Sequence, residues 1–115
     1  MKILLDENLP RKLQKLFDDA HEVRTVRDMG WLGKKNGELL GLLTLGGFDI
    51  FITIDKNLRF QQNLSKFNVS IFLLMAYNNR YDYLIPFVQQ VIKSIDSQSF
   101  ELFNLIENNR ENEQS

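Results

Sequence analysis

Two short, mostly apolar runs that end abruptly in carboxylates constrain the fold of this chain more than any other feature. One run, the strand expected over residues 2–6, ends in Asp6, and the other, residues 50–54, leads into Asp55. Continuous apolar runs of this length predict strands that are buried on both faces of a parallel sheet. Ligands of open α/β sheets bind beyond the carboxyl ends of such strands, so we expect Asp6 and Asp55 to face one pocket.

Helices are expected where apolar residues recur at helical spacing. Such spacing follows Pro10, occupies residues 39–45 before a Gly-Gly pair, and recurs over residues 84–95. We expect the first helix to reach about residue 19. Asn36 is the expected cap of the second helix, and Asn79 or Asp82 that of the third.

The order of the remaining segments predicts the architecture. Further strands are expected over residues 21–26 and 69–74 and, at a sheet edge, over 100–106, with a helical turn over 58–64. This order predicts a three-layer α/β/α sandwich with a mainly parallel central sheet. Residues 1–107 should form one domain, and the polar residues 108–115 should be a disordered tail.

Composition narrows the class of protein. The chain has 115 residues and a mass of 13.5 kDa, enough for a single hydrophobic core. It has no cysteine, which excludes disulfides, zinc–thiolate sites and a cysteine nucleophile and favours a cytoplasmic location. No apolar run approaches the length of a membrane span, so no membrane partner is expected. A formal net charge of −1 argues against nonspecific coating of a nucleic-acid duplex.

Three acidic positions are candidates for one cluster: Asp6 after the first strand, Glu38 in the first turn of the second helix, and Asp55 after the third strand. Carboxylates held close together repel unless a cation neutralises them. Magnesium and manganese prefer oxygen ligands, and such an ion activates water and stabilises a leaving oxygen. The reaction that best suits this set is hydrolysis of a phosphodiester.

Three segments carry a resemblance to a known family: residues 3–10 (ILLDENLP), residues 35–40 (KNGELL) and residues 48–58 (FDIFITIDKNL). In this order they resemble the small PIN-like domains, which are related to the toxins of bacterial type II toxin–antitoxin modules. The resemblance extends through residues 61–64 and 79–80 and covers roughly residues 1–95. It implies a PIN-like α/β/α fold and a Mg²⁺- or Mn²⁺-dependent endoribonuclease that acts on RNA. It also implies a homodimer and a cognate antitoxin as partners.

Carried over by position, the resemblance makes Asp6, Glu38 and Asp55 the catalytic acids and metal ligands, with Asn36 as a further ligand. Many PIN-like sequences have acids where this chain has Asn36 and Asn57. An amide ligates a metal through its carbonyl oxygen but brings no negative charge. RNA contacts are expected from residues near the strand ends, namely Glu7, Asn8, Lys35, Asn57, Arg59, Gln62 and Arg80.

Two other functions stay open. A noncatalytic module would keep the fold and bind RNA or protein without cutting. A receiver domain would also place acids after the first and third strands, but it needs a lysine after a later strand, and residues 75–79 contain none. Single residues also have plainer interpretations, because Glu38 suits a helix cap and Asp49 and His21 fall away from the expected pocket.

Overall fold

The computed structural model describes residues 1–60 and 64–108, without the side chains of residues 59 and 60. Its centre is a five-stranded sheet with strand order β2-β1-β3-β4-β5, and each of the four pairings is parallel. The strands are β1 (Lys2–Leu5), β2 (Glu22–Thr25), β3 (Ile50–Thr53), β4 (Ser70–Leu74) and β5 (Phe103–Ile106). The predicted α/β class and parallel sheet are confirmed, and the expected edge strand near the C-terminus is β5.

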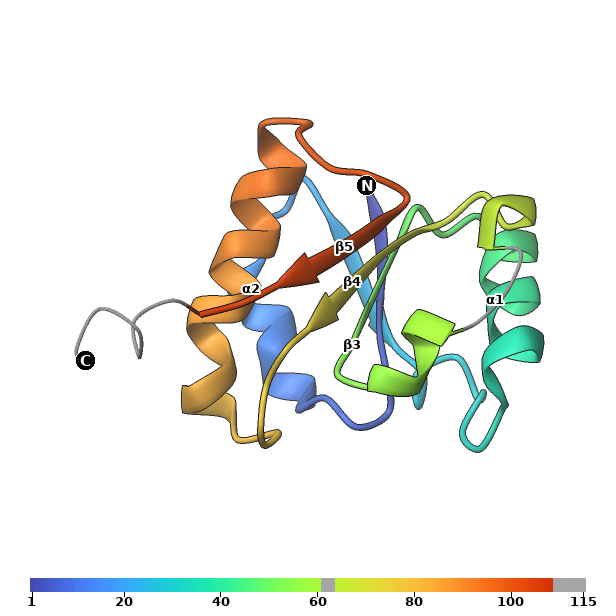
Figure 1. Ribbon diagram of the computed structural model, residues 1–115, viewed down its shortest axis with the longest axis horizontal. Helices are drawn as coiled ribbons and strands as arrows, with labels where there is room; N and C mark the ends of the chain where they lie inside the picture. The colour runs from blue at the N-terminus through green and yellow to red at the C-terminus, as the bar shows by residue number, and fades with distance from the viewer. Residues whose placement is uncertain (61–63, 109–115) are drawn as a thin grey trace.

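Helices cover both faces of this sheet (Figure 1). Helix α2 (Tyr81–Asp96) and the 3₁₀ helix η1 (Arg11–Leu16) lie on one side, and α1 (Asn36–Leu45) lies on the other. Two further 3₁₀ segments, η2 (Lys56–Phe60) and η3 (Leu64–Lys66), follow β3. The arrangement is consistent with the predicted three-layer sandwich.

The strands supply both halves of the core by simple alternation. Ile3 and Leu5 of β1 pack in the cluster beneath α2 and η1, whereas Leu4 between them packs in the cluster beneath α1. Strand β3 repeats the pattern, since Ile50 and Ile52 lie on the α2 side and Phe51 on the α1 side. Successive side chains of a strand point to opposite faces, so an unbroken apolar run is what a doubly covered strand requires.

The first helix differs from its prediction. It is a 3₁₀ helix that ends at Leu16, and Pro10 is its extended N-cap rather than part of its first turn. The side chain of Asp18 accepts a hydrogen bond from the backbone N–H of Ala20 at 2.9 Å. Aspartate that bonds to the backbone in this way favours a turn over a continuing helix, which explains the early end.

The expected caps are also displaced by one or two positions. Lys35, not Asn36, is the N-cap of α1, and Arg80, rather than Asn79 or Asp82, is the N-cap of α2. Neither cap makes a side-chain hydrogen bond to its helix. The C-terminal end of α1 follows the prediction, because Gly47 adopts a φ of 74° that glycine tolerates without strain.

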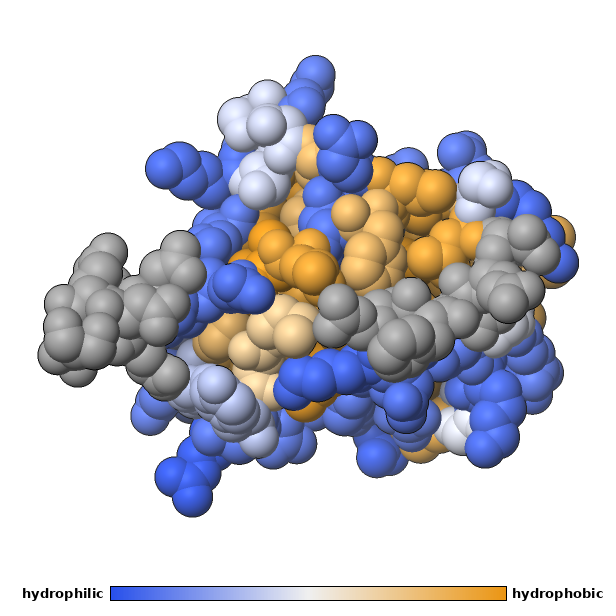
Figure 2. All heavy atoms as spheres, viewed as in Figure 1, coloured by the Kyte–Doolittle hydropathy of each residue, from blue (hydrophilic) through white to orange (hydrophobic). Residues whose placement is uncertain are grey.

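Apolar side chains gather on the surface between α1 and α2, over the β4–β5 side of the sheet (Figure 2). Leu102 and Leu105, before and within the edge strand β5, are 39% and 44% exposed. In the described part of the chain, no helix is both long enough and apolar enough to cross a membrane. The tail predicted for residues 108–115 lies, apart from its first residue, outside the described ranges.

Candidate functional site

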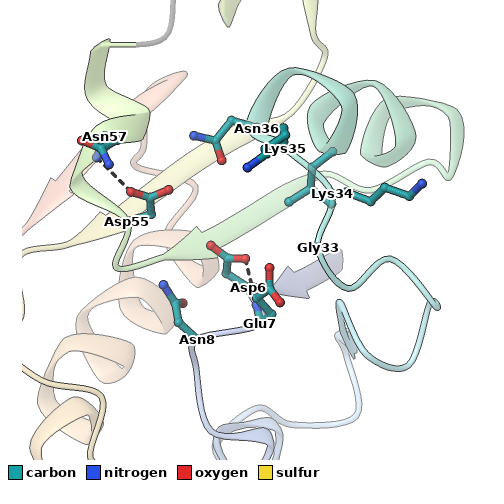
Figure 3. A pocket seen from close by; sticks show the side chains of 10 residues that line it. Asp6, Glu7, Asn8, Gly33, Lys34, Lys35, Asn36, Asp55 and Asn57 are labelled. Atoms are coloured by element: carbon teal, nitrogen blue, oxygen red, sulfur yellow. Dashed lines mark hydrogen bonds between the residues drawn. The ribbon is translucent and has the colours of Figure 1, made fainter.

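A cavity of about 440 Å³ opens at the carboxyl ends of β1 and β3 (Figure 3). These two strands are neighbours in the sheet, and from β1 the chain goes first to β2 on one side and then to β3 on the other. Such a reversal of strand order leaves a crevice in which open α/β sheets bind ligands. The cavity is lined by Asp6, Glu7, Asn8, Gly33, Lys34, Lys35, Asn36, Leu39, Asp55 and Asn57.

Asp6 is a buried acid at the floor of this cavity. Its backbone N–H donates to the carbonyl oxygen of Ile52 at 3.0 Å, which fixes the end of β1 against β3. Its carboxylate accepts two hydrogen bonds, from the Thr53 hydroxyl at 2.5 Å and from the backbone N–H of Glu7 at 2.8 Å. Only 8% of the residue is exposed. The side chain is therefore held in one orientation by the strand beside it.

Asp55 joins the site through the same threonine. The Thr53 hydroxyl, which donates to Asp6, also accepts a hydrogen bond from the backbone N–H of Asp55 at 3.0 Å. One oxygen of Asp55 accepts from the backbone N–H of Asn57 at 3.0 Å. The sequence analysis did not identify this role of Thr53. The one hydroxyl in an otherwise apolar strand was the feature that could have indicated it.

The surroundings of Asp6 disfavour its ionised form when no cation is bound. Burial raises the pKa of Asp6 above its usual 3.8, the hydrogen bonds from Thr53 and Glu7 oppose the rise, and the charges of Glu7 and Asp55 add to it. A cation between the carboxylates would reverse these repulsions and favour the ionised form of Asp6.

Amide groups complete the inner wall. In Figure 3 the side chains of Asn8 and Asn36 point toward the same space as those of Asp6 and Asp55. The Oδ1 atom of Asn8 is buried and has no hydrogen-bond donor within the described residues. Buried polar atoms nearly always have a partner, so an unpaired acceptor at a cavity wall suits a ligand or water that enters the cavity.

Glu38 is not brought to the cavity. Its carboxylate pairs with Lys34 at 3.1 Å on the surface of α1, and Asn36 lines the cavity in its place. Residues two positions apart on an α-helix lie about 200° apart around its axis, so residues 36 and 38 do not share a face. The role of Glu38 as a metal ligand and catalytic acid stays a prediction.

Acidic groups do not form a threefold cluster in the described ranges. Within residues 1–60 and 64–108, no three Asp, Glu, His or Cys side chains come together in a way that could hold a metal ion. Glu7 lines the cavity, but it is exposed, and Figure 3 draws it on the opposite side of Asp6 from Asp55. The inner donor set is therefore two carboxylates with surrounding amides.

The two lysines of the cavity wall behave differently. Lys34 extends away from the cavity toward Glu38, whereas Lys35 turns its ammonium group toward the space between Asn36 and Asp6 (Figure 3). A cation at this place is available to an anionic ligand that reaches the carboxylates.

The residues expected to contact RNA divide into three groups. Glu7, Asn8, Lys35 and Asn57 line the cavity. Arg80 does not line the cavity. Its neighbour Asn79 donates a hydrogen bond to the backbone oxygen of Asn8 at 3.1 Å, which connects the β4–α2 loop to the site. The side chain of Arg59 and the whole of Gln62 lie outside the described residues.

Two polar residues read as structural from the sequence lie away from the cavity. Asp49 accepts the backbone N–H of Lys2 at 2.8 Å, at the amino ends of β1 and β3. His21 lies 2.9 Å from Asp96 at the end of α2, with its side chain 7% exposed. Both side chains join separate elements of the fold.

Comparison of the chain with protein-family models, curated proteins and solved structures gave no match.

Proposed function

We propose that this protein is a PIN-like, Mg²⁺- or Mn²⁺-dependent endoribonuclease. The observation that carries the proposal is the pairing of Asp6 and Asp55 in one cavity through the hydroxyl of Thr53. Two acids from separate strands, one of them buried with a raised pKa, are the kind of arrangement found at functional sites. The resemblance of three sequence segments to PIN-like nucleases supports the same function.

The donor set fits one hard divalent cation. Asp6 and Asp55 offer carboxylate oxygens, and Asn8 and Asn36 offer amide oxygens on the same cavity wall. Magnesium typically uses one or two protein carboxylates and completes its shell with water and substrate phosphate. The unpaired oxygen of Asn8 further supports an oxygen-rich site that takes an additional partner. A second cation would need negative charge that Asn36 and Asn57 do not supply.

Each residue of the site then has a defined task. Asp6 and Asp55 would hold the cation, and Thr53 would keep both acids in register. Lys35 would attract the phosphate group to the carboxylates that would otherwise repel it. The bound cation would polarise the phosphoryl oxygen and activate a water for attack.

Cleavage of a fluorescent single-stranded RNA in Mn²⁺ tests the proposal. We expect Asp6→Asn and Asp55→Asn each to lower the cleavage rate at least about a hundred-fold, because each substitution removes a charge that holds the cation. Asp19→Asn is the matched control, since Asp19 is exposed and precedes β2, at the amino ends of the strands and away from the cavity at their carboxyl ends. Equal rates for all four proteins would refute a nuclease centred on Asp6 and Asp55.

A noncatalytic RNA-binding module is the second candidate. The observation that favours it is the absence, within the described ranges, of a group of three acids able to hold a metal. The same RNA distinguishes the two functions, because a binding module would retain the strand in Mn²⁺ and leave it intact.

The biological role that accompanies the proposed nuclease is that of a toxin. We expect overexpression to arrest growth, and Asp55→Asn to relieve the arrest. A small neighbouring reading frame whose product suppresses the arrest would identify the antitoxin. Growth arrest that persists with Asp55→Asn would contradict a toxin that acts by cleavage.

A further inference from the structure

A second cavity of about 130 Å³ adjoins the first at the end of β2. The two cavities share Asp6 and Glu7, and the walls of the second cavity also contain Arg11, Thr25 and Arg27, together with Leu9 and Leu32. We propose that this second cavity binds a backbone phosphate of the RNA strand, next to the phosphate that reaches Asp6 and Asp55. This inference rests on the proposed nuclease function and extends it to residues that the sequence motifs did not single out.

Arg27 brings an uncommitted positive charge to this place. It follows Val26, whose backbone N–H donates to Leu5 at 3.0 Å, so the chain after β2 remains beside the end of β1 where Asp6 begins. Within residues 1–60 and 64–108, the guanidinium of Arg27 makes neither an ion pair nor a hydrogen bond. An exposed guanidinium at a cavity wall is free to bind phosphate through two N–H groups at once.

Arg11 is the second positively charged residue of this cavity, and it forms an ion pair with Asp28. One of its terminal nitrogens lies 3.3 Å from a carboxylate oxygen of Asp28. The other oxygen of Asp28 accepts hydrogen bonds from the backbone N–H of Thr25 at 3.0 Å and from Gln14 at 3.2 Å. Arginine has five N–H donors, so this contact leaves several of them available to a ligand.

The hydrogen bonds and the ion pair around Asp28 favour its ionised form. The hydrogen bonds from Thr25 are the main cause that lowers the pKa of Asp28, with smaller contributions from Arg11 and Gln14. A carboxylate that stays ionised keeps its attraction for Arg11, whose side chain, 71% exposed, remains accessible. The cavity therefore presents one anchored and one free guanidinium.

Size and position favour a backbone phosphate as the occupant. A volume near 130 Å³ is smaller than the roughly 300–1,000 Å³ of pockets for drug-sized ligands, so a small anionic group fits better than a whole nucleotide. A single RNA strand carries one negative charge per nucleotide. Because Asp6 and Glu7 line both cavities, one strand that passes these residues can place one phosphate at the arginines and another at the acidic site.

Salt-dependent RNA binding without divalent metal tests this subsite separately from cleavage. We would measure the affinity of a fluorescein-labelled, twelve-nucleotide RNA by anisotropy in EDTA across a series of salt concentrations. Each phosphate contact on a single strand contributes about 0.7 to the slope of log affinity against log salt. We expect Arg27→Gln and Arg11→Gln each to reduce this slope by about that amount and to weaken binding about five-fold.

Arg24→Gln is the matched control. Arg24 is an exposed arginine on β2, three residues before Arg27, and is not part of the cavity wall. It should leave both the slope and the affinity unchanged. In Mn²⁺, we expect Arg27→Gln to raise KM about five-fold with kcat unchanged, because a remote phosphate contact contributes equally to substrate and transition state.

The outcomes separate the two proposals. If the parent binds and cuts RNA and the Arg27 and Arg11 variants behave like Arg24→Gln, the phosphate subsite is refuted and the nuclease stands. If RNA binding depends on both arginines but no RNA is cut in Mn²⁺, the subsite stands and the nuclease is refuted. If inorganic phosphate shifts the arginine side-chain NMR signals while RNA affinity is insensitive to both substitutions, the cavity binds free anions only and the inference is wrong.

Discussion

At the scale of single residues, the geometry of the site depends on one hydroxyl. Thr53 is fully buried, and its oxygen both donates to Asp6 and accepts from the backbone of Asp55. A buried donor and acceptor left without partners each cost free energy. Asp6 and Asp55 are therefore positioned by two hydrogen bonds that meet at the Thr53 hydroxyl, as well as by the strands that they follow.

Thr53→Val should disrupt this arrangement while nearly preserving the volume of the side chain. We expect it to lower the free energy of unfolding by about 1–3 kcal/mol, because it leaves a buried carboxylate oxygen and a backbone N–H unpaired. Urea denaturation measures the loss. Thr44→Val is the control, since that hydroxyl only donates to the carbonyl of Leu40 within α1. Equal destabilisation by the two substitutions would contradict the bridging role of Thr53.

Asp6 should make the metal-free protein less stable as the pH rises. Burial, as the largest cause, raises its pKa above 3.8 in the folded state. The folded protein then holds the proton more tightly than the unfolded chain does, so the stabilising contribution is complete below pH 3.8. It is lost as the pH rises through the folded pKa.

Asp6→Asn removes this titration and keeps a side chain able to bond with Thr53 and the backbone of Glu7. In EDTA, the variant should become progressively more stable than the parent as the pH rises from 3.8 through the raised pKa of Asp6. Urea midpoints for both proteins at several pH values test this, and carboxylates that do not interact with Asp6 cancel in the comparison. A stability difference that does not change with pH would show that Asp6 has no raised pKa.

At the scale of elements, strands could be predicted better than helices. The runs that became β1, β3 and β4 are apolar on both faces, and a parallel strand covered on both sides requires that pattern. Helix starts depend on local hydrogen bonds instead. Asp18 ends η1 by bonding to Ala20, and α1 and α2 begin without a side-chain cap, so cap preference misplaced their first residues.

The rotational position of α1 could not be predicted for a related reason. Its leucines occupy positions 39, 40, 42, 43 and 45, which spread around most of the helix and do not define a single buried face. Sequence alone thus gave no means of choosing between Asn36 and Glu38 as the residue that faces the cavity. Packing of Leu39, Leu40 and Leu43 against the sheet decides in favour of Asn36.

Exchanging charge between these two positions tests the orientation of α1. Asn36→Asp should raise Mn²⁺ affinity about ten-fold, because it adds a carboxylate on the cavity face of the helix and affinity rises with ligand charge. Glu38→Gln should leave Mn²⁺ affinity unchanged. Fluorescence-detected titration of Mn²⁺ compares the variants with the parent. Loss of affinity in Glu38→Gln with no gain in Asn36→Asp would show that Glu38 is the ligand, as the sequence resemblance implies.

At the scale of the whole molecule, the topology creates the site. The chain places β1 centrally, adds β2 on one side, and then returns to add β3, β4 and β5 on the other. The crevice at this reversal lies between the strand ends that carry Asp6 and Asp55. The adjoining arginine cavity follows from the same topology, because β2 is the other neighbour of β1. The predicted parallel sheet, with Asp6 and Asp55 after two of its strands, was sufficient to locate the first cavity. No motif of the sequence indicated the second cavity.

Calorimetric titration with Mn²⁺ tests the central claim, that Asp6 and Asp55 jointly hold one cation, most directly. We predict that the parent and Asp19→Asn each bind one Mn²⁺ per chain, whereas Asp6→Asn and Asp55→Asn each lose at least about ten-fold in affinity, since each removes one of two charged ligands. The absence of Mn²⁺ binding to the parent, or binding by either site variant as tight as that of the parent, would contradict the account.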